Sequence, residues 1–146
     1  MSAVSITAAN VLASAQAIKE WCTAGATITA GQVVYLDTST GTVKLADTDA
    51  SGTTAKAYGI ALGGASANQP ILICKEDPDF TPGGTLSISV AADKGIYILD
   101  GTAGAMCPIG DIAAGDYPVI IGVAKSTTKM FFKIVGGQSG AAALTA

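Results

Sequence analysis

The side chains that most often carry out acid–base chemistry, zinc binding or phosphate binding are scarce in this sequence of 146 residues. It contains eight lysines and eleven acidic residues, but no histidine and no arginine. Histidine is the commonest general base and metal ligand, and arginine is the usual bidentate partner of phosphate and carboxylate groups. The serines therefore have no histidine with which to form an ordinary triad. We expect no enzyme activity and no catalytic residue.

One segment has the opening pattern of a calcium-binding loop. Asp47, Asp49, Ser51 and Gly52 occupy the spacing D-x-D-x-S-G. Such a loop needs a bidentate glutamate at its twelfth position, and that position is Tyr58 here. The segment is therefore interpreted as a polar hairpin turn, and we predict no metal site.

The densest acidic run is Glu76-Asp77-Pro78-Asp79. Two-carboxylate catalysis requires carboxyl groups that face each other across a substrate, and a local run seldom provides that geometry. The proline restricts the backbone of this segment, which favours a solvated acidic loop. We predict no bound cofactor here or elsewhere in the chain.

The cysteines Cys22, Cys74 and Cys107 are widely spaced and form no C-x-x-C pair. An odd number of cysteines cannot make a complete disulfide framework within one chain. The favoured interpretation is three small buried thiols in a reducing compartment. One disulfide with a free or reactive thiol left over is the alternative.

Charge and hydropathy exclude two classes of partner. The formal net charge is −3, whereas nucleic-acid binding proteins place a lysine- and arginine-rich face against phosphates. No segment approaches the ~18 continuous apolar residues of a membrane-spanning helix, and the N-terminus lacks the basic region of a signal peptide. We therefore expect neither nucleic-acid nor membrane binding, and synthesis in the cytoplasm.

The backbone that must position these side chains is expected to be all-β, with little or no helix. Short segments rich in β-branched residues alternate with clusters of glycine, serine, threonine and aspartate. This spacing predicts a small β-barrel or β-sandwich. Strands are expected over 3–7, 17–23, 32–37, 42–46, 57–62, 70–74, 85–90, 95–100, 118–124 and 130–135.

Residues 7–23 allow two interpretations. By propensity, 7–22 favours a helix with Thr7 as its N-cap and Gly25 beyond its end. The same residues can also form a loop followed by a strand over 17–23.

The sequence also repeats itself at an interval of 63 residues. The strand VVYLD (33–37) aligns without gaps with IYILD (96–100), Gly41 aligns with Gly104, and Gly59 aligns with Gly122. Turn glycines and strand ends are positions where backbone geometry dictates the residue type. The repeat predicts a fold built from two similar β units.

We accordingly predict a single β domain over 1–135, with the two units at about 25–73 and 84–135. The last residues, 136–146, contain no charge and no periodic pattern. They are predicted to form a flexible C-terminal tail.

Most of the chain, from about residue 5 onward, resembles a family of bacteriophage proteins, the capsid cement or head decoration proteins. Turn glycines and alternating strands carry the resemblance, and they include no active-site signature. The residues 74–80, CKEDPDF, depart from the family pattern, which has a plainer turn there. The similar segments are ITAANVLAS (6–14), AGATITAGQVVYLD (24–37), VKLAD (43–47), YGIAL (58–62), QPILI (69–73), GTLSISV (84–90), GIYILD (95–100), GTAGAMCPIGDIAAGDY (101–117), IGVAKSTTKMFFKI (121–134) and SGAA (139–142).

The resemblance implies a small β-barrel or β-sandwich on the outer surface of the virion, where it clamps adjacent copies of the major capsid protein. Such subunits often sit as homotrimers at local three-fold positions. In the family the segment after 6–14 is a strand, which favours a strand over 17–23 in this chain. The protein would be made in the host cytoplasm and would need no catalysis.

The candidate partner interface consists of the single tryptophan and the unusual acidic segment. Tryptophan is enriched in the central contacts of protein interfaces. The alternative function is a tail, fibre or adhesin module that recognises a host glycan or protein, for which Trp21 and the acidic run 76–79 are the candidates. The candidate interface residues are Trp21, Glu76, Asp77, Asp79 and Phe80.

Overall fold

The computed structural model describes residues 3–89 and 95–136, and within them the protein is all-β. Its strands form one curled antiparallel sheet, and the helical turns within these described residues are two 3-10 segments, η1 (Ala8–Asn10) and η3 (Ile109–Asp111). The predicted fold class is confirmed. The strands are β1 (Ile18–Thr23), β2 (Val33–Asp37), β3 (Thr42–Leu45), β4 (Ala57–Ala61), β5 (Pro70–Phe80), β6 (Ile96–Leu99), β7 (Met106–Pro108), β8 (Val119–Ala124) and β9 (Met130–Gly136).

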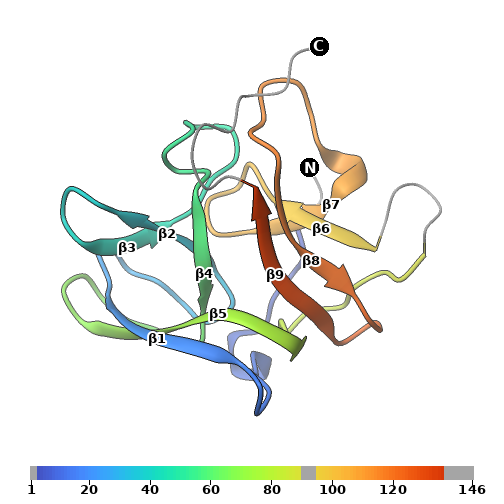
Figure 1. Ribbon diagram of the computed structural model, residues 1–146, viewed down its shortest axis with the longest axis horizontal. Helices are drawn as coiled ribbons and strands as arrows, with labels where there is room; N and C mark the ends of the chain where they lie inside the picture. Colours follow the sequence, from blue (N-terminus) through green and yellow to red (C-terminus); the bar gives the residue numbers. More distant parts are fainter. Residues whose placement is uncertain (1–2, 90–94, 137–146) are drawn as a thin grey trace.

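The order of the strands divides the sheet into two units that meet in the middle. The order is β3-β2-β4-β5-β9-β8-β6-β7, so β5 and β9 are the neighbours that join the units. In Figure 1 the strands of the first unit lie on the left and those of the second on the right. Strand β1 pairs with β5 and lies outside this path.

Strand register repeats between the two units at the interval seen in the sequence. Val34 lies opposite Leu45 in the β2–β3 pair, and Tyr97 lies opposite Pro108 in the β6–β7 pair. The β2–β4 and β6–β8 pairs also correspond, and each has a β-bulge at the same place, after Val34 and after Tyr97. The two units therefore share their strand pairing and their irregularities.

The aligned glycines have the same structural role in both units. Gly41 and Gly104 have φ angles of 72° and 81°, which side chains with a Cβ rarely adopt. Gly59 and Gly122 lie where a Cβ would collide with a backbone carbonyl of the neighbouring strand. These are steric requirements, which explains why glycine occurs at both members of each pair.

The larger core cluster draws side chains from both units. Phe80 on β5 and Phe132 on β9 are both fully buried at the junction, with their ring centroids 5.5 Å apart. Aromatic rings at this separation gain from both area burial and their relative orientation. A second, smaller cluster lies within the first unit and contains Ile28, Val34, Val43, Ile71 and Ile73.

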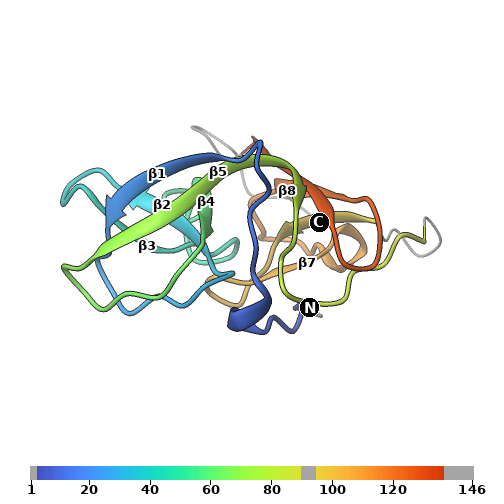
Figure 2. The same cartoon turned by 90° about the horizontal axis from the view of Figure 1, so that it is seen from below.

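The N-terminal segment ties the two units together. The Val4 amide donates to the carbonyl of Met106 on β7, and the Thr7 amide donates to the carbonyl of Gly83. Leu12 exchanges two backbone hydrogen bonds with Thr81, just after β5. In Figure 2 this segment, in dark blue, runs across the middle of the molecule.

Some local elements differ from those predicted from the sequence. The strand expected over 17–23 is present as β1 over 18–23, and η1 is the only helical turn in the ambiguous segment. The segments 3–7 and 85–89 form no strand, because they make isolated backbone bonds instead of a ladder, and β7 was not expected. Apart from Gly136, the predicted tail at 136–146 lies outside the described residues.

Candidate interaction surface

The predicted interface tryptophan lies on the most exposed strand of the sheet. Trp21 on β1 has 69% of its surface exposed, and Ile18 on the same strand is also exposed. Within the described residues β1 has a strand partner, β5, along one edge alone. An edge strand with exposed apolar side chains is a surface suited to further pairing.

Two of the other predicted interface residues, Asp77 and Phe80, are buried. Both have 0% exposure, and the Phe80 ring packs in the core against Phe132. The prediction that these two side chains are exposed in an interface is therefore wrong. The strand register shifts at a β-bulge between Asp77 and Phe80. Phe80 is buried in the core, whereas Asp77 is covered by Ser14 of the N-terminal segment.

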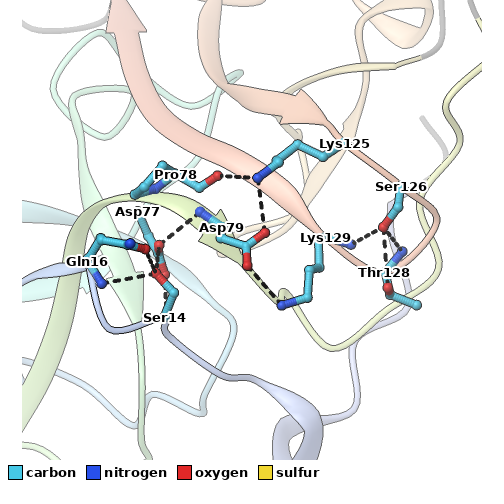
Figure 3. Close-up of polar contacts among 9 residues, drawn as sticks. All are labelled: Ser14, Gln16, Asp77, Pro78, Asp79, Lys125, Ser126, Thr128 and Lys129. Carbon is cyan, nitrogen blue, oxygen red and sulfur yellow. Dashed lines mark hydrogen bonds and ion pairs between the residues drawn. The ribbon is translucent and has the colours of Figure 1, made fainter.

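The acidic run belongs to β5 and is not the solvated loop that the sequence favoured. Pro78 sits in the bulge, where its missing N–H interrupts no ladder hydrogen bond. The side chain of Asp79 points outward and bridges two lysines of the β8–β9 turn, Lys125 at 3.0 Å and Lys129 at 3.1 Å. The Lys125 ammonium also donates to the Pro78 carbonyl, and Figure 3 shows the resulting network.

The Asp77 carboxylate accepts hydrogen bonds from the N-terminal segment and from the backbone of β5. The backbone amide of Ser14 donates to it at 2.7 Å, the Ser14 hydroxyl donates to its other oxygen, and the Asp79 amide donates at 3.0 Å (Figure 3). A buried carboxylate with three donors fixes the N-terminal segment to β5.

Replacing Asp77 with alanine is expected to lower the free energy of unfolding by about 3 kcal/mol, because it leaves two partly buried amides, of Ser14 and Asp79, without acceptors. Denaturation by urea measures this loss. Asp79→Ala is the matched control, since that carboxylate is exposed and its loss is expected to cost much less. Equal losses in the two variants would show that Asp77 is no more important than a surface charge.

The Asp79 ion pairs predict a pH dependence of stability. Hydrogen bonds from Lys125 and then Lys129 hold the pKa of Asp79 below its usual value. A carboxyl with a lowered folded pKa contributes stability above its unfolded pKa of about 3.9, and this contribution disappears as the pH falls through the folded value. The unfolding free energies of wild type and Asp79→Asn should therefore differ at neutral pH and converge in strong acid. A constant difference would contradict this assignment.

Glu76 lies half-exposed on the outer side of β5. Its carboxylate is 3.8 Å from the ammonium of Lys133 on β9, a loose pair near the rim of a surface pocket. Glu76 and Trp21 project from neighbouring strands, whereas Asp79 lies at the other end of β5. The structure thus divides the predicted interface into an exposed β1–β5 region and a separate ion-pair network.

The sequence analysis missed a row of exposed apolar side chains on the second unit. Ile96 pairs with Val123, and Val123 pairs with Phe131, so the three residues lie side by side across β6, β8 and β9. Directly opposite residues share a face of the sheet. All three are exposed, and we call them the outer apolar row.

The next row along the same strands has the opposite orientation. Tyr97 pairs with Gly122, Gly122 pairs with Phe132, and Tyr97 and Phe132 are buried in the core. The consecutive phenylalanines at 131 and 132 could have predicted an exposed aromatic side chain, because adjacent residues of a strand point to opposite faces of the sheet.

The three cysteines are free thiols with little nucleophilic character. Cys74 and Cys107 are buried, whereas Cys22 is partly exposed, unlike the favoured interpretation. Burial raises the pKa of Cys22 and of Cys74 to about 11, and it also raises the pKa of Cys107. Thiols with pKa values this high are almost fully protonated at neutral pH.

Corresponding polar pairs differ between the two units. The ammonium of Lys44 lies 2.7 Å from the carboxylate of Asp37. The corresponding residues in the second unit are Cys107 and Asp100, and Asp100 is fully buried. Its Oδ1 atom is the buried side-chain oxygen that lacks a hydrogen-bond partner in the described chain.

The calcium-like segment forms a local turn. The Asp49 amide donates to the Asp47 carboxylate at 3.1 Å, and contact with Asp47 raises the pKa of Asp49. No group of three histidine, cysteine or acidic side chains is placed to hold a metal ion within residues 3–89 and 95–136.

The chain matches no protein-family model, and no curated protein is significantly similar to it. Among the described residues no helix is long and apolar enough to cross a membrane.

Proposed function

We propose that this protein is a structural component of a bacteriophage particle, a decoration or cement subunit that binds the outer surface of the capsid. Its partner is the major capsid protein, and it needs no catalysis, cofactor or metal. The proposal rests on the sequence resemblance described above together with the surface of the molecule. The all-β architecture agrees with what the resemblance implies.

The observation that carries this proposal is the outer apolar row, Ile96, Val123 and Phe131. These side chains lie side by side on the exposed face of the sheet, whereas their neighbours Tyr97 and Phe132 point into the core. Contiguous exposed apolar side chains on a soluble protein mark interaction surfaces. A chain in which 13% of residues are charged also has few charges to desolvate on contact with a lattice.

A subunit of this kind stabilises the shell by linkage. If it binds the assembled shell and not the free capsid protein, its binding free energy adds to the stability of the assembled state. Assembly as a homotrimer gives each particle-bound trimer three copies of the contact surface. Simultaneous contacts then raise the overall affinity without any new type of contact.

Quantitative mass spectrometry and electron microscopy of purified particles test the function. We expect many copies distributed over the outer surface of the head, at sites related by the capsid symmetry. A few copies confined to the tail would overturn the proposal and support a tail, fibre or adhesin module that binds a host glycan or protein.

A further inference from the structure

A surface pocket of about 270 Å³ lies at the junction of the two units, where β1, β4, β5 and β9 meet. Its apolar walls come from Ile18, Ala57 and Ile134, and its charged lining residues are Lys75, Lys133 and Glu76. The pocket therefore combines hydrocarbon walls with two lysines and one carboxylate, which gives its lining a net positive charge.

Within the described residues the Lys75 ammonium forms no ion pair, since the lysines that do so are Lys44, Lys125, Lys129 and Lys133. Its Nζ atom lies over the ring of Tyr58, 2.8 Å from the ring centroid. Burial lowers the pKa of Lys75, and the nearby Glu20 carboxylate only partly opposes this effect. A partly buried ammonium without a counter-ion is costly, and an anion delivered by a ligand would remove that cost.

The nearest carboxylates are already engaged elsewhere. The Tyr58 hydroxyl donates to Oε2 of Glu20 at 2.5 Å, and this bond lowers the pKa of Glu20. It also fixes the Tyr58 ring beneath the lysine. Glu76, at the rim, lies 3.8 Å from Lys133 and not against Lys75.

We infer that this pocket binds a carboxylate on a short aliphatic stem, with the carboxylate at Lys75 and the stem against Ile18 and Ile134. The ammonium provides the charge complement, Lys133 adds a second positive charge at the same lining, and the apolar walls bury the stem. Glutamate side chains of a partner protein and free short-chain carboxylic acids share this chemistry. The inference does not depend on the proposed capsid function.

The test uses the full-length protein labelled with ¹³C at the lysine Cε atoms and followed by NMR. Propionate is titrated at constant ionic strength, with neutral propionamide as the isosteric control. We expect a saturable change in the Lys75 signal with propionate and none with propionamide. A capped Ala-Glu-Ala peptide is the second arm: tighter binding than propionate assigns a protein side chain as the source, and binding of propionate alone assigns a free acid.

Lys75→Met is expected to weaken propionate binding about tenfold or more, since it removes a charged hydrogen bond. Lys19→Met is the matched control, because it removes the same charge from neighbouring β1 outside the pocket lining, and it should bind like wild type. Lys133→Met provides an independent second variant and should bind more weakly than wild type.

Three results would overturn the inference. They are a Lys75 signal that does not saturate, an equal response to propionamide, and unchanged binding by both the Lys75→Met and the Lys133→Met proteins. None of them bears on the location of the protein in virus particles, so the pocket and the proposed function fail or stand separately.

Discussion

Replacing Phe132 with alanine is expected to destabilise the protein by about 3–5 kcal/mol, the usual range for removing a fully buried phenylalanine. The ring has 0% exposure and packs against Phe80, with an angle of 43° between the ring planes. Because β9 pairs with β5 at this point, the variant removes an anchor that both units share. The expected loss of stability has two parts: the free energy of burying the phenyl ring, and the cost of the cavity left between the two units.

Phe131→Ala is the matched control for this prediction. It removes the same side chain one residue earlier on β9, from a position that is 42% exposed. Surface substitutions of this kind usually change stability by about 0.5 kcal/mol or less. Urea denaturation of the two variants measures the contrast, and a similar loss in both would contradict the assignment of Phe132 to the inside and Phe131 to the outside.

The second large effect is expected on particle binding. A double variant with Val123→Ser and Phe131→Ser removes two of the three side chains of the outer apolar row. Burying a large apolar side chain contributes about 1.5–3 kcal/mol, so the double variant should bind capsids at least about 100-fold more weakly. Binding is measured by adding purified protein to particles that lack it and quantifying the bound fraction.

Leu12→Ser is the control for particle binding. Leu12 is also exposed, but it lies on the N-terminal segment, outside the three strands of the outer apolar row. Its replacement should leave particle binding unchanged. Thermal unfolding of each variant separates lost binding from lost folding. Wild-type binding by a folded double variant would eliminate the outer apolar row as the contact surface.

Strand positions could be predicted from the sequence because they depend on local patterns. The segments 32–37 and 57–62 combine β-branched and apolar residues between glycine-rich turns, and strands β2 and β4 lie within them. Strand β7 was missed because it has only three residues, Met106–Pro108, one of them a proline. The repeat was visible because steric limits keep glycine at Gly59 and Gly122 alike.

The direction of individual side chains could not be predicted, because it depends on register and on bulges. Alternation would leave one of Asp77 and Phe80 on the outer face, yet both are buried, Phe80 in the core and Asp77 beneath the N-terminal segment. The same limitation hid the pocket at Lys75, whose lining comes from four strands that are distant in sequence. The acidic run 76–79 distinguishes β5 in the sequence, but it does not reveal which side chains of β5 are exposed to solvent.

If an uncharged apolar surface attaches this protein to a virus shell, the attachment should withstand washing of purified particles in concentrated salt. At ~1 M salt the screening length falls to about 3 Å, so attachment by surface ion pairs weakens strongly while apolar contacts persist. We expect the same amount of head-bound protein before and after such a wash. Complete release at moderate salt would contradict attachment by apolar contacts.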